Sequence, residues 1–430
     1  MSIYHDQLIS IRRQLHQNPE EGWSEFTTTA FLVKTLRSYG YQVLLGRNII
    51  DPDACLGREM SVVKAGIERA RKNGVSEELL AEMQELTGCV AVLDTGRPGP
   101  TLALRFDIDC IPVTESTDDK HVPTHCGFAS KNPGFMHACG HDAHMSMGLA
   151  VCHWLMDNKD KLSGKVKILF QPAEEGVRGA AGMAASGILD DCDYFLSSHV
   201  AMLAKSGELA TNLYGFLCTT KYDVTFNGRA SHAAGTPVGA TSFTSTRYSA
   251  SPFAAAANAT VQMLGISRHG GGMTRINIGQ LVAGEGRNVI PSKAVMKLEV
   301  RGETMEINNY MSEQVTNIVE GIAKGFSVTY DMRKMGEAVD LTADQELIDI
   351  LNESGREVGL KVLDKPLNFG GSEDATILAR RVQAHGGKAA FFVWGSDRPS
   401  GHHSALFDIQ EKDMAPAFDL WTHVLPKILK

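Results

Sequence analysis

The sequence predicts an α/β protein in which a discontinuous domain with a mixed, largely parallel sheet carries an inserted ferredoxin-like domain. Short apolar runs alternate with helix-like stretches from residue 41 to residue 200 and again after residue 334. Between them, residues 221–334 show the order βαββαβ, which forms a compact unit of its own. A chain of 430 residues is long enough for two domains. We therefore expect one domain from 1–215 with 334–430, and a second from 216–333.

The first domain is expected to begin with a helix and a short strand in YQVLLG. Residues 51–86 are charged, poor in strand formers and strongly helical. After them, GCVAVLDTG and TLALRFDID are predicted to be adjacent buried strands. A helix over 144–157, the strand KVKILFQ, a helix of small residues and the strand DYFLSSHV are expected to follow.

In the insert, the predicted order is strand KYDVTFNG, helix 252–264, strands RINIGQLVAG and KAVMKLEVRG, helix 305–324 and strand FSVTYDMRK. After the insert, the pattern of alternating strands and helices resumes. Helix 343–358, the glycine-rich turn NFGGSEDAT and the strand AAFFVWG are expected there. The Ser/Thr-rich stretch 241–251 is the best candidate for a mobile loop.

The composition indicates which compartment the protein works in and which classes of partner it does not bind. The formal net charge of −8 implies no basic face for nucleic acid or an anionic membrane. No apolar run is long enough to span a bilayer, and the first residues lack the basic-then-apolar order of a signal peptide. The eight cysteines are scattered without pairing-like spacing. We therefore expect a cytoplasmic protein with reduced thiols.

Metal-competent side chains concentrate in MHACGHDAHM (136–145), which holds one Cys, three His and one Asp. Thiolate and imidazole are good ligands for transition metals. A small structural zinc site usually needs a second pair of ligands with matching spacing, and the other cysteines supply none. Further ligands for this stretch must therefore come from other parts of the chain. Several candidates follow predicted parallel strands, at the edge where open α/β sheets place their sites. They are Asp107, Asp109, Glu174, Glu175, His199 and the GHHS stretch at 401–404.

Each of these candidates also has a simpler interpretation. A single histidine at a strand end is usually structural, paired glutamates usually form a solvated face, and the two aspartates can cap a turn. His137 and His144 are expected to pack or to support ligands rather than to bind metal. Five separate segments nevertheless place metal-competent residues on one predicted edge, which favours a metal site. A helix beginning near Asp142 is expected to lower the pKa of Cys139. Because successive strand side chains point in opposite directions, one of the adjacent Glu174 and Glu175 can bind metal while the other faces a bound water.

Several motifs, taken together in order, resemble a known family. The motifs are RFDID, MHACGHDAH, FQPAEEG, SSHV, FNGRASHAA, RNVIP, GGSEDAT and GHHS. They are similar to the aminoacylase/carboxypeptidase family of dinuclear metallo-amidohydrolases, in the branch with hippurate hydrolases and auxin-conjugate hydrolases. The resemblance covers nearly the whole chain. It implies a metallopeptidase-type catalytic domain and an inserted lid and dimerisation domain.

The resemblance also implies two divalent metal ions, with Mn²⁺ favoured and Zn²⁺ possible. Glu174 would be the general base and Asp109 would orient a ligand. Most relatives outside this branch have His-x-Asp where this chain has Asp107-Ile108-Asp109. That histidine ligand is missing here, and the resemblance implies that His141 takes over its metal-binding role. In GHHS, His402 is an alternative to His403. The implied metal ligands are Cys139, His141, Glu175, His199 and His403.

Substrate contacts are implied for the insert and for one turn. His232 would donate a hydrogen bond to the oxyanion, acting in the partner's site. Asn288, Arg301 and the turn Gly371-Ser372 would hold the substrate carboxylate, since a guanidinium and exposed N–H groups both bind anions. Simpler interpretations are that Asn288 shapes a turn and that Arg301 pairs with a glutamate. The segment 238–251 is longer than the resemblance leads us to expect.

The implied activity is hydrolysis of the amide bond of N-acyl or N-aroyl amino acids, with p-aminobenzoyl-glutamate preferred. The enzyme would be a homodimer or a heteromer with a paralogous chain. The alternative enzyme is a broader aminoacylase-type deacylase or small-peptide carboxypeptidase. A non-catalytic metal- or ligand-binding homologue and a structural zinc module are further alternatives, and an intact Glu174 argues against the former.

Overall fold

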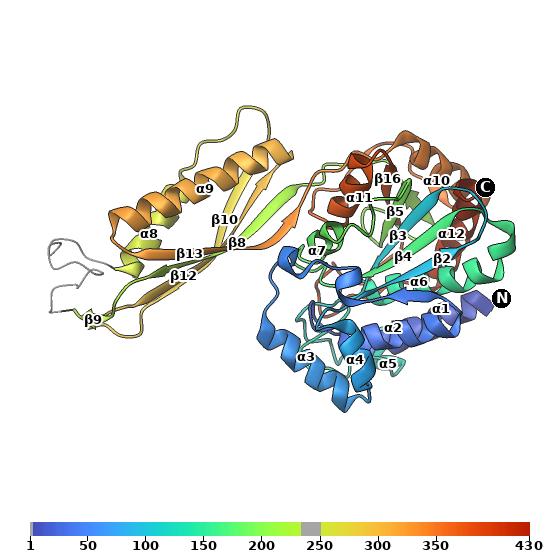
Figure 1. Cartoon of the computed structure of the whole chain (residues 1–430), viewed down its shortest axis with the longest axis horizontal. Helices are drawn as coiled ribbons and strands as arrows, with labels where there is room; N and C mark the ends of the chain where they lie inside the picture. Colours follow the sequence, from blue (N-terminus) through green and yellow to red (C-terminus); the bar gives the residue numbers. More distant parts are fainter. Residues whose placement is uncertain (1–2, 234–250) are drawn as a thin grey trace. The chain divides into compact units, whose positions relative to one another are not determined.

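The computed structural model describes residues 3–233 and 251–430, which form two compact units (Figure 1). The first unit comprises Met1–Gly215 and Leu341–Lys430, and the second comprises Phe216–Asp340. The chain re-enters the first unit at Leu341 rather than at residue 334, because strand β13 (Thr329–Ala338) continues past Lys334. None of the helices that the structure describes has the length and apolar character needed to span a bilayer.

The first unit is built on an eight-stranded mixed sheet in the order β1-β2-β4-β3-β5-β16-β6-β14. The neighbouring strands β4, β3, β5 and β16 are parallel, whereas β2 runs antiparallel to both β1 and β4. The prediction that GCVAVLDTG and TLALRFDID lie side by side is wrong, because β4 pairs with both and separates them. The strands are β1 (Gln42–Leu44), β2 (Cys89–Asp94), β3 (Thr101–Asp107), β4 (Lys165–Gln171), β5 (Tyr194–Val200), β6 (Glu208–Ala210), β14 (Lys361–Val362) and β16 (Lys388–Trp394).

Helices cover both faces of this sheet. On one face, Phe106 packs against Trp421 of α12, and α6 passes so close that its Gly148 abuts Phe106. The preceding residue, Arg105, points to the opposite face, where α7 and α11 lie, because successive strand side chains alternate. The helices are α1 (Ile3–His16), α2 (Phe26–Ser38), α3 (Met60–Lys72), α4 (Glu77–Met83), α5 (Val122–His125), α6 (His141–Asp157), α7 (Ala180–Ala185), α10 (Gln345–Glu357), α11 (Ala375–Ala384) and α12 (Met414–Ile428).

Two helices, rather than the single one predicted, precede β1. Helix α1 ends at His16, and Pro19 follows shortly after; a proline disfavours helical backbone in the residue before it. The helical character expected for 51–86 is confirmed by α3 and α4. Trp23, between α1 and α2, is buried, and its Nε1 donates to Leu56 O, which ties this region to the core.

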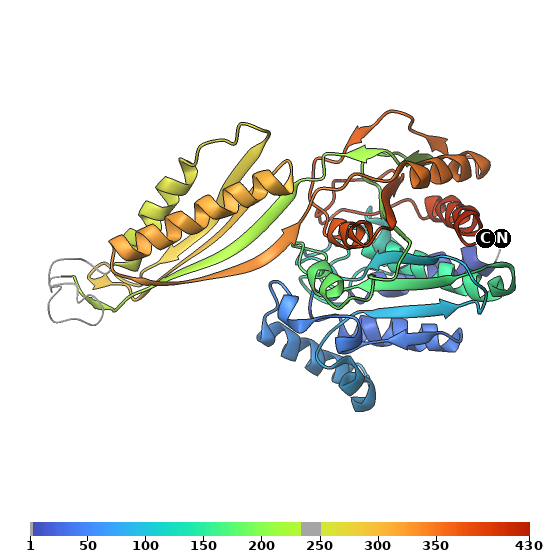
Figure 2. The same cartoon turned by 45° about the horizontal axis from the view of Figure 1, so that its top comes forward.

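The second unit is a four-stranded antiparallel sheet in the order β10-β12-β8-β13, with α8 and α9 side by side on one face (Figure 2). The chain order βαββαβ and this strand order are those of a ferredoxin-like fold. Its apolar core includes Phe226, Met296 and Val315. The elements are β8 (Cys218–Asn227), α8 (Pro252–Leu264), β10 (Thr274–Ala283), β12 (Lys293–Gly302), α9 (Met305–Gly325) and β13.

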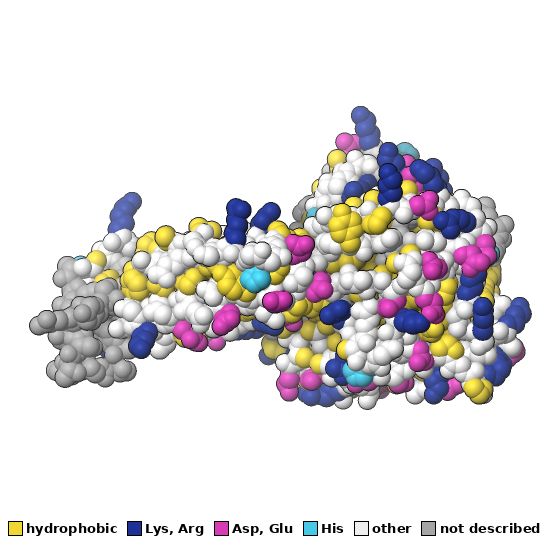
Figure 3. Space-filling view, turned by 90° about the horizontal axis from the view of Figure 1, so that it is seen from above, with side chains coloured by type: hydrophobic (Ala, Val, Ile, Leu, Met, Phe, Trp, Pro, Cys, Tyr) yellow, Lys and Arg dark blue, Asp and Glu magenta, His cyan; other side chains and the backbone are white. Residues whose placement is uncertain are grey.

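Two short strands extend this unit, β9 (Ser231–His232) and β11 (Val289–Ile290), which pair antiparallel. The predicted loop 241–251 and the long segment 238–251 lie outside the described residues, except for Ser251. The Ser251 side chain accepts a hydrogen bond from Ala254 N and caps α8. Figure 3 shows hydrophobic side chains on the surface of the second unit. The exposed hydrophobic residues of this unit include Val261 and Leu264 of α8 and Val282 of β10.

Candidate metal centre

Metal-competent side chains from five segments meet at the carboxyl ends of the parallel strands. Asp107 ends β3, Glu174 follows β4, His199 lies near the end of β5, and His141 begins α6. This is the edge at which the sequence predicted a site. The groups whose ligand atoms lie within 4.8 Å of one another are Cys139–His199–His402, Asp107–His141–His144, Cys139–Glu175–His403, His141–Glu174–Glu175 and Glu174–Glu373–Asp374.

Gly140 brings the Cys-x-His turn against β5. Its φ of 87° is in the left-handed region that favours glycine. A Cβ at this position would lie 2.5 Å from Val200 Cγ1, so a larger residue fits only if the Val200 side chain is displaced. As a result, Cys139 Sγ lies 3.4 Å from His199 Nε2.

The ring nitrogens of His141 and His199 are oriented by backbone carbonyls. His141 Nδ1 donates to Asp109 O at 2.9 Å, and His199 Nδ1 donates to Val200 O at 2.8 Å. Each donation directs Nε2 into the centre. Within the described ranges, His141 Nε2 is buried and makes no hydrogen bond of acceptable geometry, and it lies 3.9 Å from Glu174 Oε2. A buried, oriented imidazole nitrogen of this kind fits a metal ligand.

Asp109 connects two of the proposed ligands. Its Oδ2 accepts from Glu175 N at 2.9 Å, and its Oδ1 lies 3.3 Å from His141 Nδ1. On the other side, Glu175 Oε1 lies 3.3 Å from His403 Nε2. The completely buried Asp109 carboxylate thus sits where it can orient both groups.

Hydrogen bonds distinguish the two histidines of GHHS. Arg398 Nη1 contacts His402 Nδ1, and a guanidinium can only donate, so Nδ1 is the acceptor. The hydrogen of His402 is then on Nε2, which faces Val200 O at 3.4 Å. Burial and the charge of Arg398 lower the pKa of His402 to about 3. Both ring nitrogens of His402 are therefore engaged, whereas His403 Nε2 faces Glu175.

His144 supports the centre without offering a lone pair to it. Its Nδ1 donates to Asp107 Oδ1 at 2.6 Å, and its Nε2 accepts from Val200 N at 3.0 Å. Burial alone would raise the pKa of Asp107, but His141, His144 and Arg105 hold it well below its usual value. Asp107 therefore serves as an anionic anchor for His144. His137 is buried too, and neither ring nitrogen has a hydrogen-bond partner among the described residues.

Three side chains of this centre have raised pKa values. Burial and the charge of Glu175 raise the pKa of Cys139 well above its usual value, so the prediction of a lowered pKa at the start of α6 is wrong. Burial would lower the pKa of His141, but Asp107, Asp109 and Cys139 raise it well above its usual value. Burial, Glu373, Glu175 and Asp374 raise the pKa of Glu174 strongly. Binding of cations would displace these protons, because ligands bind in their deprotonated forms.

Three buried charged residues next to this centre were not predicted. Arg105 contacts Asp107 Oδ2 at 2.7 Å, Glu373 Oε1 at 3.0 Å and Asp374 Oδ1 at 3.1 Å. Asp374 and Glu373 directly follow Gly371 and Ser372 in the turn before α11. RFDID and GGSEDAT contained all three residues, but no spacing rule links a strand residue to a turn so distant in sequence.

The other predicted substrate residues belong to the second unit. His232 pairs with Val289 in the short β9–β11 ribbon, and Asn288 O accepts from Ala233 N at 2.9 Å in the adjoining turn. Arg301 Nε donates to Glu299 Oε1 at 3.0 Å, which corresponds to the simpler interpretation of an ion pair with a glutamate.

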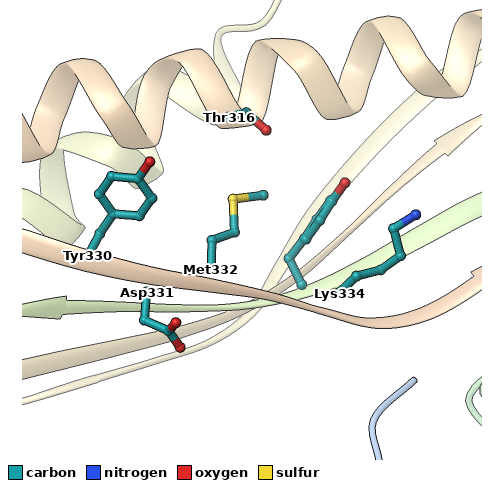
Figure 4. A pocket seen from close by; sticks show the side chains of 6 residues that line it. Thr316, Tyr330, Asp331, Met332 and Lys334 are labelled. Carbon is teal, nitrogen blue, oxygen red and sulfur yellow. The ribbon is translucent and has the colours of Figure 1, made fainter. Parts of the chain in front are cut away.

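The second unit also contains a hollow of about 650 Å³ between α9 and the sheet. In Figure 4, Tyr330, Met332 and Lys334 point towards α9, whereas Asp331 points to the other face of β13. Lys334 Nζ contacts Glu337 Oε1 at 2.6 Å. The described residues that line this hollow include none of the predicted site residues and form no cluster of metal ligands.

Comparison with known proteins bears directly on the interpretation of this centre. The profile of peptidase family M20/M25/M40 matches residues 103–427, which span β3 to α12 and all of the candidate ligands. The chain belongs to this M20 family. The family resemblance inferred from the motifs, the α/β fold with its mixed sheet and the assignment as a hydrolase are thereby confirmed.

Individual relatives of this M20 hydrolase span nearly all of its length. It is 48% identical over 431 residues to a homologue of a p-aminobenzoyl-glutamate hydrolase chain in Haemophilus influenzae, with 100% of both proteins covered. It is 40% identical to the indole-3-acetyl-aspartic acid hydrolase of Enterobacter agglomerans, over 95% of this chain and 92% of that protein. The crystal structure of an aminobenzoyl-glutamate utilization protein from Klebsiella pneumoniae matches with a TM-score of 0.81 and 34% identity, covering 98% of this chain and 95% of that one.

Proposed function

We propose that this M20 hydrolase cleaves the amide bond of N-aroyl and N-acyl amino acids, with p-aminobenzoyl-glutamate as its preferred substrate. The observation that carries the proposal is the position of Glu174 beside the buried Nε2 of His141, within a cluster of Cys, His and Glu side chains. A binding protein needs no carboxylate facing the space between ligands, whereas a hydrolase needs a base there. The names of the relatives from Haemophilus and Klebsiella support the substrate.

The proposed ligands of two divalent cations are Cys139, His141, Glu175, His199 and His403. Mixed thiolate, imidazole and carboxylate donors suit Zn²⁺ and also admit Mn²⁺, and we favour Mn²⁺ from the family resemblance. When bound, the cations would polarise the scissile carbonyl and lower the pKa of water. The residues need no large rearrangement, since their donor atoms already lie within 4.8 Å of one another in small groups.

The chemistry of the chain's own residues centres on one proton transfer. Glu174 would take a proton from the attacking water and deliver it to the amide nitrogen as the C–N bond breaks. The products are a carboxylic acid and a free amino acid, for example p-aminobenzoate and glutamate. Asp109 would hold His141 and the backbone of Glu175 in place during this step.

The proposed substrate contacts come from both units. The turn Gly371-Ser372 would offer N–H groups to a carboxylate, and Asn288 and Arg301 would add polar contacts. Because Arg301 Nε and Nη2 face Glu299, its remaining Nη1 would bind the substrate. His232 would stabilise the oxyanion in the partner's site, within a homodimer or a heteromer with a paralogous chain. We place the enzyme in the cytoplasm, on the basis of its scattered free cysteines.

A second candidate substrate class is favoured by one comparison. The relative from Enterobacter agglomerans is named for hydrolysis of indole-3-acetyl-aspartic acid, an acyl amino acid with a different ring and a shorter side chain. Both substrates share an aromatic acid joined to a dicarboxylic amino acid. A broad aminoacylase or a small-peptide carboxypeptidase would instead accept simple acyl groups or dipeptides.

The test is a substrate panel with the purified protein, first stripped of metal and then loaded with Mn²⁺, Zn²⁺ or Co²⁺. The panel contains p-aminobenzoyl-glutamate, indole-3-acetyl-aspartate, hippurate, N-acetyl amino acids and dipeptides. We expect the highest kcat/KM for p-aminobenzoyl-glutamate and no turnover without metal. Preference for simple acetyl amino acids would favour the aminoacylase alternative. Stoichiometric metal binding without any turnover would favour a non-catalytic homologue.

A further inference from the structure

The segment that carries Glu174 and Glu175 has an irregular backbone that needs external support. It links β4 to α7 and contains two non-glycine residues with left-handed backbone, Ala173 at φ 53° and Val177 at φ 60°. Such a conformation is unfavourable for residues with a Cβ and persists only where contacts hold it. The position of the proposed base therefore depends on what fixes the two ends of this segment.

One buried carboxylate binds both ends. Asp374 Oδ1 accepts from Gln171 Nε2 at 2.8 Å, at the end of β4. Its Oδ2 accepts from Gly179 N at 3.1 Å and from Ala180 N at 3.0 Å, where α7 begins. Gly179 lies so close to the start of the segment that a Cβ there would be 1.8 Å from Pro172 O. Asp374 is thus the common acceptor that closes the segment 172–179 into a tight loop.

Arg105 fixes Asp374 in turn. The guanidinium is fully buried and donates from Nη2 to Asp374 Oδ1 at 3.1 Å and from Nε to Gln171 Oε1 at 2.8 Å. Its Nη1 donates to Asp107 Oδ2 at 2.7 Å, and Asp107 holds His144. A planar fork with several donors can hold these acceptors in one fixed geometry, which a flexible ammonium group cannot.

We propose that Asp374, held by Arg105, is a positioning residue that sets the placement of Glu174 and Glu175 in the metal centre. In this role Asp374 acts through the backbone of the segment 172–179 and not by contact with substrate or metal. The inference rests on the proposed function for the roles of the two glutamates. The role of Asp374 in closing the loop is argued from the contacts of Asp374, Arg105 and Gln171, which add to the backbone hydrogen bonds from Arg178 N and Gly179 N to Ala173 O.

The test compares Asp374→Asn with Asp344→Asn in the full-length protein. Asp344 is a matched control, because its Oδ2 also accepts from a backbone N–H and from a glutamine amide, those of Ala389 and Gln383, away from the centre. In Asp374→Asn, amide hydrogens of the segment 172–180 should exchange at least ~10-fold faster. Mn²⁺ titration of the metal-free protein should show ~10–100-fold weaker binding, the usual cost of losing a group that supports a ligand.

Turnover supplies a third readout. We expect kcat for p-aminobenzoyl-glutamate to fall with KM changed less than about twofold, since the base and not the substrate contacts is displaced. Wild-type exchange in 172–180 together with wild-type Mn²⁺ affinity in folded Asp374→Asn would overturn the proposal. If that variant does not fold, Gln171→Met, which removes the amide contacts with Asp374 and with Arg105, should show the same changes to a smaller degree, and unchanged exchange there would also overturn the proposal. If the wild-type enzyme hydrolyses no aroyl amino acid, the proposed function fails, while exchange and metal binding still test the positioning role.

Discussion

Glu174 and Glu175 are neighbours in the chain, yet their surroundings differ. Glu175 is tied to Asp109 through its backbone N–H and faces His403, whereas Glu174 is buried near Glu373 and His141. These different surroundings support the proposal that Glu175 binds metal and Glu174 accepts a proton. This division is the basis for separating their roles by mutation.

Glu174→Gln should retain both metal ions but lower kcat by ~10²–10⁴-fold, the usual contribution of a general base. The amide has nearly the same shape as the carboxylate but cannot accept the proton of water. Metal content by plasma mass spectrometry and steady-state kinetics would be measured on the same preparation. Near-normal turnover would remove Glu174 from the mechanism.

His403→Ala and His402→Ala should differ in metal content. His402 uses Nδ1 to accept from Arg398, and its Nε2 faces Val200 O, whereas His403 faces Glu175. We expect the His403 variant to lose at least one of the two ions after dialysis and the His402 variant to keep both. Metal loss in the His402 variant alone would reverse the assignment.

A buried histidine at the end of helix α1 contacts two acidic side chains from other parts of the first unit. His16 Nδ1 lies 2.8 Å from Asp142 Oδ2, and His16 Nε2 lies 2.9 Å from Glu115 Oε1. Burial alone would lower the pKa of His16, but the charge of Asp142 and the hydrogen bonds to both acids raise it to about 9. The protonated ring therefore stabilises the folded state.

The sign of the resulting pH dependence follows from this raised pKa. The stabilisation is fully present below the unfolded pKa of about 6.5 and is lost as the pH rises towards 9. At ~1.4 kcal/mol per pH unit, the free energy of unfolding should lose up to about 3 kcal/mol relative to His16→Gln over this range. Urea unfolding of both proteins at several pH values, with His385→Gln as a surface control, measures it. A constant difference between wild type and His16→Gln would contradict the prediction.

Hydrophobic periodicity was sufficient to predict most elements and their order. Helix α8 has the predicted bounds, and α9 ends one residue beyond its prediction, because their apolar positions recur at helical spacing. The pairing of β4 between β2 and β3 was not predictable, since local pattern does not specify which buried strands are neighbours. That the candidate metal ligands would meet at one edge of the sheet could be predicted, because the carboxyl ends of parallel strands lie at the same edge.

Side-chain contacts between segments far apart in the sequence could not be predicted from the sequence pattern. Arg105 and Asp374 are 269 positions apart, and their ion pair exists only because β3 and the turn before α11 meet. The choice between His402 and His403 likewise depends on Arg398 and on the carbonyl of Val200. The pKa of Cys139 was mispredicted because burial beside Glu175 outweighs the effect of the start of α6.

Assembly of the complete enzyme is tested by mixing two inactive variants. Glu174→Gln alters a residue of the first unit, and His232→Ala alters a residue of the second. His232→Ala alone should lower kcat by roughly 10²–10³-fold, the cost of one missing oxyanion donor. If His232 acts in the partner's site, mixed dimers contain one site with both residues intact, and activity should partly return. With exchange of protomers verified by mass spectrometry, activity that stays at the level of the separate variants would exclude this role.

The central claim, that this M20 hydrolase holds two metal ions between Cys139, His141, Glu175, His199 and His403, is tested most directly by anomalous diffraction from crystals grown with Mn²⁺. We predict two anomalous peaks ~3.5–4 Å apart, the usual separation of a two-metal hydrolase site, within bonding distance of these five residues. A single peak, or peaks held instead by the Glu174–Glu373–Asp374 group, would contradict the proposed centre.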